Sequence, residues 1–449
     1  MPKCENNNLS RQLIAVLCFH SSSHLFFRDL VRLWRAIVFI TDWHNVNHYF
    51  SRLVSLIVSC LISAGAAFAA EEPNSNTSQL PAYTSSLVFP HDTNHNHAPG
   101  IVEYPNGDLL VSWYRGSGER TADDVAIYGA HRRRGSDQWS KAFVMADRTG
   151  FPDCNTCMMI DNQKQLWLFW PTILANSWES CITNYQVSRD YENTNAPRWQ
   201  KSDIILLKPD DFSGDVTKVI ETILPTIRPL LKERDLKEIE EAKAKLDNKL
   251  YQRLGWQPRC KPTVLPSGRI LLPLYTDTFS ISIMAISDDQ GRHWYASKPL
   301  IGLGNIQPSV LRRHDGTLVA YMRENGVTGH IRVSESKDDG ITWGPVGVSS
   351  LLNPGAGVDG VRLRNGHWVM VYNDTKDSRH RLAISLSENE GRTWKWTRHL
   401  EDDRKGSYHY PAVIQAKDGA VHIVYSYHVP KGKTMKHVRL NEAWIRAGE

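Results

Sequence analysis

The sequence contains several polar side chains that could act together on an anionic sugar. Arg323 and Arg379 each follow an expected strand, and a guanidinium binds a carboxylate through paired hydrogen bonds while keeping its charge. Tyr408 begins a later strand. Glu119 and Asp124 follow an earlier strand, where a carboxylate can act as general acid or base. These residue types predict a site that binds an acidic sugar and transfers a proton.

The elements that would position these side chains repeat along the chain. A short turn leads into an apolar strand six times, which is the pattern of repeated strand pairs. The turns are Asn106-Gly107, Asp161-Asn162, Ser267-Gly268, Asp315-Gly316, Asn365-Gly366 and Asp418-Gly419. From Gly268 onward they recur about every 50 residues, a spacing typical of a repeat architecture.

A second motif runs in phase with these turns. It reads Ser287-x-Asp289-x-Gly291-x-x-Trp294 and recurs over residues 336–343 and 387–394. Its Asp or Asn side chain can accept hydrogen bonds from backbone N–H groups of a tight turn, and its Gly permits positive φ. The Trp offers a large apolar face for packing. The motif therefore predicts a structural element and carries no argument for catalysis.

Repeats of about 50 residues with several strands each are typical of a β-propeller. We predict an all-β fold, a six-bladed propeller over residues 82–445, in which a strand near 82–90 closes the ring. The expected blades are 91–145, 146–205, 254–300, 301–350, 351–402 and 403–445. Residues 213–253 have helical apolar spacing, which predicts a helical insertion between blades 2 and 3. The insertion is expected to be a solvated hairpin or a lid at the rim of the site.

In such a ring, the loops that enter the first strand and leave the second strand of each blade open on one face. The strand entries carry His97, Asn155, Arg259, Gln307, Asp359 and Tyr408. The strand exits carry Arg115, Trp170, Asp277, Arg323, Asn373 and Tyr425. Converging polar side chains predict a binding site, although they could instead satisfy one another around a wet channel. We expect the substrate to contact His97, Arg115, Arg259, Asp359, Asn373, Arg323 and Arg379.

The N-terminal region is predicted to lie outside the fold. Residues 53–70 form an apolar run that ends in Ala67-Phe68-Ala69, a pattern typical of a secretory signal peptide. Residues 1–52 are expected to be absent from the mature protein, as if the start codon were assigned too far upstream. Export to the periplasm or the exterior follows, without a stable membrane span. A transmembrane helix over the same run and a lipoprotein anchored at Cys60 are the alternatives.

Composition excludes several classes of protein and of partner. With 449 residues, 41% hydrophobic and 22% charged, the chain is unlike a disordered, coiled-coil or multi-span membrane protein. Lys and Arg number 53 against 48 Asp and Glu, and no dense basic tract is present, so no nucleic-acid partner is expected. The sequence contains no phosphate loop, nucleotide fingerprint or readable metal-ligand cluster, so neither a cofactor nor a metal is expected. The oligomeric state stays open.

The cysteines give a prediction of their own. Cys154-x-x-Cys157 has no second CxxC pair that would complete a zinc site. For an exported protein, a disulfide that involves Cys181 is therefore the expectation.

The repeated boxes and the six-blade layout resemble the sialidase (neuraminidase) superfamily with its BNR, or Asp-box, repeats. The resemblance covers roughly residues 85–445, and GNIQPSVLRRHDGTLVAYMREN and YHYPAVIQAKDG look closest to its bacterial predicted-neuraminidase branch. It implies an enzyme in which three arginines hold the sugar carboxylate, a Tyr paired with Glu is the nucleophile, and an Asp is acid and base. A Tyr nucleophile avoids the repulsion that a carboxylate would meet at an anomeric carbon bearing its own carboxylate.

The resemblance identifies part of this set. It places the nucleophile on Tyr408, the second arginine on Arg323 and the third on Arg379, with Arg381 as a competitor for the third. No Asp aligns with the acid and base, so Glu119 is the nearest candidate and Asp124 the next.

Two positions depart from the superfamily pattern. The place of the first arginine reads His97-Ala98-Pro99, and the Glu that activates the Tyr falls on Gln307. An amide cannot take a proton from Tyr408, and His97 binds a carboxylate only when it is protonated. We therefore expect the fold to match the superfamily more closely than the mechanism does.

Three functions are consistent with the sequence. The first is an exported exo-glycosidase that hydrolyses a terminal acidic sugar, sialic acid or similar, from a glycan. The second is a polysaccharide lyase in which Arg323 or Arg379 neutralises a uronate and His97 or Tyr408 handles the proton. The third is a propeller that binds glycans without turnover.

Overall fold

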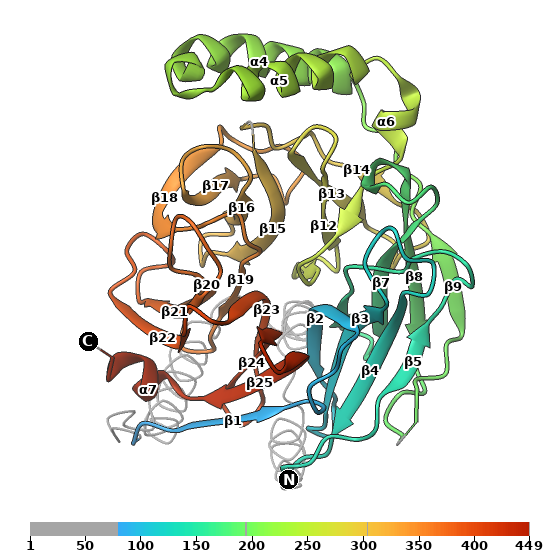
Figure 1. The fold of residues 1–449 in the computed structure, drawn as a ribbon, viewed down its shortest axis with the longest axis vertical. Coiled ribbons are helices and arrows are strands. Elements are labelled where there is room, and N and C mark those ends of the chain that lie inside the picture. Colours follow the sequence, from blue (N-terminus) through green and yellow to red (C-terminus); the bar gives the residue numbers. More distant parts are fainter. Residues whose placement is uncertain (1–79, 194, 303, 449) are drawn as a thin grey trace, which may run out of the picture. The chain divides into compact units, whose positions relative to one another are not determined.

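The repeated strand pairs are the inner halves of antiparallel sheets. The computed structural model describes residues 80–448 apart from 194 and 303, and within them the strands form six sheets arranged in a ring (Figure 1). The prediction of a six-bladed all-β propeller is therefore confirmed. Residues 1–52 and 53–70, for which a dispensable leader and a signal peptide are predicted, lie outside the described residues.

The first three blades span the first half of the ring. Blade 1 consists of β2 (His95–Glu103), β3 (Leu109–Gly116), β4 (Ala126–Arg132) and β5 (Phe143–Ala146). Blade 2 consists of β6 (Cys157–Ile160), β7 (Leu166–Ile173), β8 (Cys181–Ser188) and β9 (Lys201–Ile204). Blade 3 consists of β10 (Gln257–Pro258), β11 (Thr263–Val264), β12 (Ile270–Thr276), β13 (Ile281–Ser287) and β14 (Tyr295–Ala296). Both β10 and β11 pair with β12, so the innermost strand of blade 3 is interrupted.

The last three blades complete the ring. Blade 4 consists of β15 (Asn305–Arg312), β16 (Leu318–Glu324), β17 (His330–Ser336) and β18 (Gly347–Leu352). Blade 5 consists of β19 (Asp359–Arg362), β20 (Trp368–Asn373), β21 (Arg381–Ser387) and β22 (Trp396–Asp402). Blade 6 consists of β23 (Ser407–Gln415), β24 (Val421–Val429), β25 (Gly432–Leu440) and β1 (Tyr83–Leu87). Because β1 pairs with β25, strands from both ends of the propeller share one sheet, as the predicted closing strand required.

The hydrophobic core is divided into wedges between neighbouring blades. Strands β7, β12 and β20 are buried along their whole length, because both faces of a blade pack against other blades. Leu271 of blade 3 and Leu318 of blade 4 share one cluster, and Tyr321 of blade 4 and Trp368 of blade 5 share the next. Each blade is thus held by its neighbours, and the inner strand ends are left free to carry polar side chains.

The repeated boxes form turns between the third and fourth strands of blades 3, 4 and 5. In the blade 4 copy, Ser336 Oγ accepts a hydrogen bond from Gly340 N at 3.0 Å, and Asp338 accepts one from Thr342 N at 2.9 Å. The blade 5 copy repeats this geometry with Asn in place of Asp. A Cβ atom on its Gly391, whose φ is 80°, would lie 2.1 Å from the hydroxyl of Tyr321. The boxes are therefore structural turns, as predicted.

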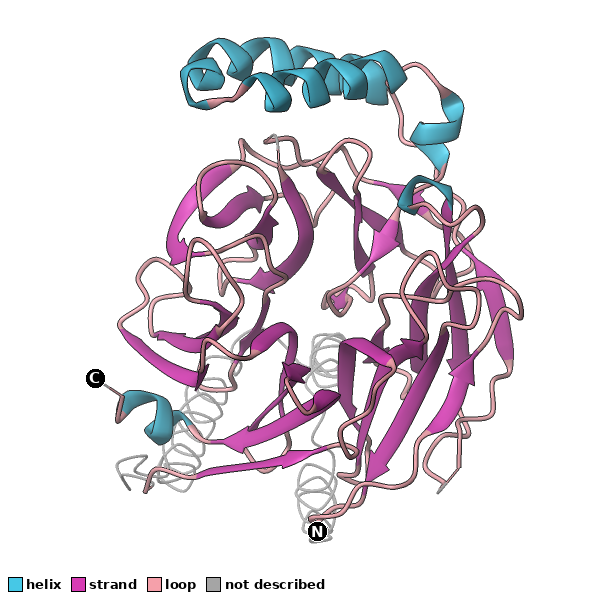
Figure 2. Cartoon of the chain, in the orientation of Figure 1, coloured by secondary structure: helices cyan, strands magenta, loops and turns pink. Residues whose placement is uncertain are grey.

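The helical insertion between blades 2 and 3 is also present, and its helices lie at the outer edge of the ring (Figure 2). It consists of α4 (Phe212–Ile227), η2 (Arg228–Leu230), α5 (Glu233–Lys245) and α6 (Lys249–Arg253). Helix α4 packs Phe212, Val216 and Ile220 into the core cluster that blades 2 and 3 share. Two further short helices are η1 (Trp178–Ser180) and α7 (Glu442–Arg446). Within the described residues, no helix has the length and apolar character needed to cross a membrane.

The expected disulfide is not present. Cys154, Cys157, Cys181 and Cys260 are all buried free thiols. Cys181 Sγ instead donates to the carbonyl of Trp256 at 3.7 Å, and Cys260 Sγ donates to that of Val358 at 3.1 Å. Burial raises the pKa of Cys260 to about 12, so its thiolate is suppressed. The prediction for Cys181 was wrong because its thiol is used in packing.

Candidate active site

The inner strands of three blades share a backbone irregularity where they approach the axis. Ala98, Gln307 and Tyr410 have positive φ angles of 51°, 56° and 55°, and each stands directly before a proline. The strand register shifts at the same places in β2, β15 and β23. A left-handed non-glycine residue costs about 1–3 kcal/mol, and such strain gathers at functional sites. Three copies at equivalent positions mark this part of the axis as the candidate site.

Tyr410 is the centre of the polar contacts at this point. Its hydroxyl oxygen accepts hydrogen bonds from Gln307 Nε2 at 3.1 Å and Arg323 Nη1 at 2.9 Å. Gln307 Nε2 also donates to the hydroxyl of Tyr275 at 3.0 Å, and Asn155 Nδ2 donates to that hydroxyl at 3.1 Å. The Tyr410 oxygen therefore faces two donors, one of them cationic. This arrangement suits an oxygen that carries negative charge during a reaction.

Three guanidinium groups surround the ring of Tyr410. Besides Arg323, Arg259 Cζ lies 5.0 Å and Arg379 Cζ lies 5.5 Å from the ring centroid. Arg259 is only 1% exposed, and its Nη2 donates to the carbonyl of Pro411 at 2.9 Å, which fixes the backbone just after Tyr410. The Nε atoms of Arg259 and Arg323 are buried and have no partner among the described residues. A buried cationic donor without a partner is suited to an anionic ligand.

Asp277 supplies a carboxyl group beside the arginines. It accepts a hydrogen bond from Gln257 Nε2 at 2.9 Å. Burial raises the pKa of Asp277 to about 6, although the nearby Arg323 and Arg120 act in the opposite direction. A carboxyl group with this pKa gains and loses its proton close to neutral pH, as a general acid or base must. The sequence placed Asp277 in the ring of strand exits without giving it a catalytic role.

Glu119 is a second carboxylate at the same opening. It accepts a hydrogen bond from the hydroxyl of Tyr114, and it lies 3.4 Å from Arg120 Nη1 and 4.0 Å from His95 Nε2. Its side chain is 32% exposed. Glu119 therefore borders the site through Tyr114, and its predicted role as acid or base stays a prediction.

His97 packs directly on Tyr410. The two rings are stacked, with centroids 4.3 Å apart, and His97 Nδ1 lies 2.8 Å from Ser426 Oγ. Burial, reinforced by His409 and His428, lowers the pKa of His97 well below its usual value. The imidazole is therefore neutral near pH 7 and does not replace the missing arginine as a cation. It holds the ring of Tyr410 in place.

Tyr408 does not reach this group of side chains. It is 1% exposed, lies in the apolar cluster of blades 5 and 6, and packs on Tyr427 with ring centroids 5.2 Å apart. The cause is the register shift between His409 and Ala412, which interrupts the regular alternation of β23. Tyr410, two residues further on, is the tyrosine that contacts Gln307 and Arg323, and the role predicted for Tyr408 stays a prediction.

Two other predicted residues lie away from Tyr410. Arg115 Nη2 forms an ion pair with Asp92 at 2.6 Å, because alternation along β3 directs Tyr114 and not Arg115 to the site. Asp124 accepts hydrogen bonds from the backbone N and the Oγ of Ser117, which lower the pKa of Asp124. Asp124 therefore stabilises the loop after β3 through Ser117 and does not contact Tyr410.

Asn373 and Asp359 form hydrogen bonds that hold the segments around the site in place. Asn373 Nδ2 donates to the carbonyl of Tyr408 at 2.8 Å and to that of Arg379 at 3.3 Å, which joins the Arg379 loop to β23. Asp359 is 1% exposed and accepts from Lys261 Nζ at 2.7 Å and from Val413 N at 2.9 Å. Both side chains form hydrogen bonds within the protein, and neither contacts Tyr410 directly.

A signal for Tyr410 was present in the sequence. Ala98-Pro99, Gln307-Pro308 and Tyr410-Pro411 are X-Pro dipeptides at equivalent strand entries. The residue before a proline is restricted in its backbone conformation, so a dipeptide that recurs in phase indicates a shared local geometry. Aligning these dipeptides would have selected Tyr410 over Tyr408.

The helical insertion borders the same side of the ring. A cleft of about 1130 Å³ lies between helices α4 and α5 and the edge of blades 3 and 4. Asp277 lines one part of it, and Ile220, Ile239, Val327 and Trp343 line other parts. The insertion therefore forms one wall of a cleft that includes a residue of the candidate site.

Comparisons with known proteins agree with this architecture. Residues 248–423 match a family described as a BNR repeat-like domain. A sialidase from Micromonospora viridifaciens is 24% identical over 178 residues, which are 36% of this chain and 26% of that protein. The match therefore spans about a quarter of the length of this curated relative.

Solved structures share this fold over about four fifths of the chain at low sequence identity. A protein of unknown function from Dyadobacter fermentans has a TM-score of 0.62 and 14% identity, over 81% of this chain and all of that one. The NanB sialidase from Streptococcus pneumoniae has a TM-score of 0.57 and 11% identity, over 80% of this chain and 71% of that one. At such identities the likeness establishes the fold alone.

Proposed function

We propose an enzymatic activity for this chain. The repeat match and the six-bladed fold support its membership of the sialidase and BNR-repeat superfamily. The proposed activity is that of an exported exo-glycosidase that hydrolyses a terminal acidic sugar, sialic acid or one similar to it, from a glycan. The observation that carries this proposal is the hydroxyl of Tyr410, which accepts hydrogen bonds from Arg323 and Gln307 within a group of three arginines.

The arginines recognise the sugar through its carboxylate. Arg323 and Arg379 come from the open ends of blades 4 and 5, and Arg323 has a buried Nε without a partner among the described residues. A carboxylate placed there would gain charge-assisted hydrogen bonds of about 1.5–3 kcal/mol each. Its position fixes the anomeric carbon next to Tyr410.

Tyr410 then acts as the nucleophile. Its phenolic proton leaves to a water in the opening, because Gln307 is an amide and cannot accept it. The phenol oxygen forms a bond to the anomeric carbon while the bond to the leaving oxygen breaks, and Asp277 protonates that oxygen. A water then attacks the same carbon and gives a proton to the Asp277 carboxylate, which releases the sugar and leaves Tyr410 as a phenolate. The phenolate takes back a proton from the water in the opening, which restores Tyr410. Glu119 is the competing candidate for the acid.

A uronate lyase is the second candidate, because of two specific observations. Gln307 stands where a hydrolase of this superfamily would need a carboxylate, and a neutral His97 stacks on Tyr410. In a lyase the arginines would neutralise the uronate carboxylate, and His97 or Tyr410 would remove the proton on the adjacent carbon. The leaving oxygen then departs without addition of water, and the product is unsaturated.

Export is part of the proposal. It rests on the apolar run over residues 53–70, which ends in Ala67-Phe68-Ala69. Fractionation of expressing cells, followed by mass analysis of the N-terminus of the secreted or periplasmic chain, tests it. A chain that remains in the cytoplasm with its full N-terminus would contradict export.

The test of the activity is a substrate panel. The purified chain is offered fluorogenic sialosides and uronic-acid polymers, and the products are identified by mass. A free sugar that has gained water supports the glycosidase, and an unsaturated uronate supports the lyase. Binding of these glycans without either product overturns both and identifies a binding module. The Gln307→Glu variant adds to the first two outcomes, because a carboxylate there can take the Tyr410 proton and should speed hydrolysis. An elimination in which His97 is the base should not respond.

A further inference from the structure

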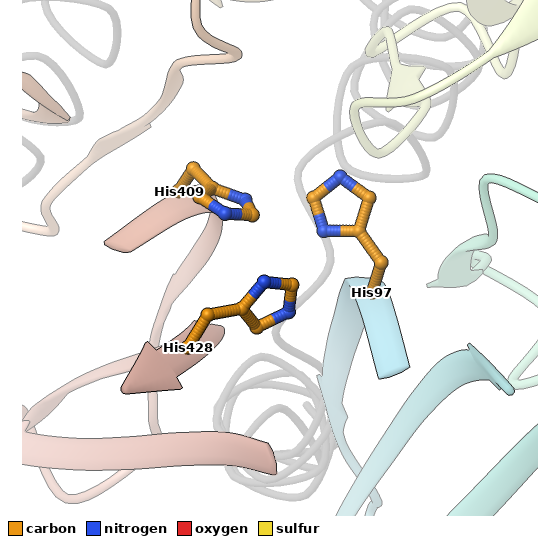
Figure 3. A group of neighbouring side chains, drawn as sticks. All are labelled: His97, His409 and His428. Atoms are coloured by element: carbon orange, nitrogen blue, oxygen red, sulfur yellow. The ribbon is translucent and has the colours of Figure 1, made fainter. Parts of the chain in front are cut away.

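A cluster of three histidines lies beside the ring of Tyr410. His97 comes from β2, His409 from β23 and His428 from β24, and Figure 3 shows the three imidazoles facing a common space. One potential ligand nitrogen from each lies within 4.8 Å of the other two. We propose that His97, His409 and His428 bind one divalent transition-metal ion of the zinc type.

The spacing of the nitrogens fits a metal after small movements. For three atoms at most 4.8 Å apart, a point exists that is no further than about 2.8 Å (4.8 Å divided by √3) from each. Zinc–nitrogen bonds are about 2.0–2.1 Å long. Each imidazole therefore needs to approach by less than about 1 Å, which small side-chain rotations supply.

The hydrogen bonds around the cluster prepare its nitrogens to be ligands. His428 Nε2 lies 2.8 Å from the carbonyl oxygen of Asn96, which can only accept, so Nε2 carries the proton and Nδ1 presents its lone pair. Metal-bound histidines commonly donate their second N–H to a backbone carbonyl in this way. Ser426 Oγ, at 2.8 Å, orients His97 through its Nδ1.

His409 supplies an unpaired polar atom. Its Nδ1 is buried and has no partner among the described residues, and its side chain is within the cluster, with ring centroids 4.6 Å from His97 and 4.7 Å from His428. A buried polar atom without a partner is destabilising unless a ligand or water satisfies it. A metal ion would satisfy it.

The donor atoms of the cluster select the kind of ion. All three members are histidines, so the cluster offers imidazole nitrogens and no carboxylate oxygen. Mg²⁺ and Ca²⁺ need oxygen ligands, whereas imidazole suits Zn²⁺, Ni²⁺ or Cu²⁺.

The chain contains a matched control for this cluster. His422 and His437 are also buried in blade 6, but they bond to each other at 2.9 Å, and their rings are stacked. Because these two imidazoles bond to each other, they do not form a three-histidine metal site. Substitution of His422 therefore changes the histidine count and the packing of the same blade without touching the proposed site.

The test is metal binding by the full chain produced without a histidine tag. The protein is stripped with a chelator, dialysed against Zn²⁺, and assayed for retained metal by elemental analysis. We expect about one equivalent in the wild type and in His422→Gln, and background in His409→Gln. Ser426→Ala should weaken binding about 10–100-fold, as expected for loss of a group that orients a ligand. Equal retention by wild type and His409→Gln, or background in both, would overturn the proposal.

A second measurement keeps the proposal testable if His409→Gln does not fold. Co²⁺ bound by three imidazoles in a four-coordinate site should give a visible absorption band, which Zn²⁺ displaces stoichiometrically. Absence of the band in the folded wild type would contradict the site. Neither readout uses enzyme activity, so this inference and the proposed function fail independently.

Discussion

The Asp-box turns and the strand entries around the axis of this propeller are both repeated. The boxes repeat side-chain hydrogen bonds, whereas the strand entries repeat a backbone conformation. Three box turns make the same hydrogen bonds from equivalent positions, and the accepting side chain is Asp338 in blade 4 and Asn389 in blade 5. At the axis the repeated feature is the backbone: Ala98, Gln307 and Tyr410 share a left-handed φ and carry unrelated side chains. Side-chain repetition therefore marks what holds blades together, and backbone repetition with varied side chains marks the site.

The difference has a physical cause. Each box lies on a turn between outer strands and stabilises that turn in the same way in every blade that has one. A substitution in one box therefore weakens only its own turn. At the axis the blades face one another across a shared space, and a single ligand meets a different side chain from each. Predictions that separate the two regions test whether function is confined to the second.

The largest effect is expected at Tyr410. Tyr410→Phe removes the oxygen that Arg323 and Gln307 contact and should lower kcat at least about a thousandfold, as loss of a nucleophile does. Tyr408→Phe is the matched control, because Tyr408 lies in the apolar core, and its kcat should change less than about threefold. Steady-state kinetics on the best substrate of the panel measures both. A larger loss for Tyr408→Phe would return the site to the position predicted from the sequence.

A second large effect is expected from Asp277→Asn. Asp277 must be protonated to act as an acid, and its pKa is about 6, so the wild-type rate should fall as pH rises through about 6. The variant should lose about a hundredfold in rate and should lack this limb of the profile. A pH series of kcat/KM for Asp277→Asn beside Glu119→Gln measures this. If Glu119→Gln loses the limb and Asp277→Asn keeps it, the acid is Glu119.

Arg323→Gln should have a smaller effect, mainly on substrate affinity. It removes charge-assisted hydrogen bonds to the carboxylate, and kcat/KM should fall about 10–100-fold, mostly through KM. Arg115→Gln is the control, because Arg115 pairs with Asp92 and should leave KM unchanged within about twofold. An equal rise in KM for both would mean that the carboxylate lies nearer blade 1 than the geometry indicates.

The smallest effect on activity is expected in the boxes. Asp338→Ala removes the acceptor for Thr342 N and should destabilise the fold by about 1–2 kcal/mol with kcat unchanged. Asp338→Asn should cost less, because Asn389 makes the same bond to Thr393 in blade 5. Urea unfolding measures both free energies. A loss of kcat in a fully folded Asp338→Ala would break the division between the two regions.

Much of the fold could be read from the sequence because the periodic parts obey local rules. The turn before each strand, the boxes and the helical spacing of residues 213–253 predicted the blades and the insertion. The same reasoning failed where long-range packing decides. The register shift in β23 brings Tyr410 to the axis, and no periodic pattern predicts a bulge without the recurring X-Pro signal. The thiol of Cys181 is likewise enclosed by residues distant in sequence, so no cysteine count could have shown that it is unpaired.

The three-histidine cluster was missed for a related reason. His97 and His409 are more than three hundred residues apart, and β2 and β23 meet only because the ring closes. A metal site with ligands of this separation has no local spacing to detect. Predicting it would have required the register of blade 6 against blade 1.

The proposed mechanism depends on the attack of Tyr410 on the anomeric carbon of an acidic sugar. Trapping tests it most directly: the chain is incubated with a fluorinated analogue of the sugar that the panel identifies, digested, and mapped by mass spectrometry. We expect one sugar adduct on the peptide that contains Tyr410, absent in Tyr410→Phe and retained in Tyr408→Phe. An adduct on Tyr408, Glu119 or Asp277, or no adduct from an analogue that stops turnover, would contradict it.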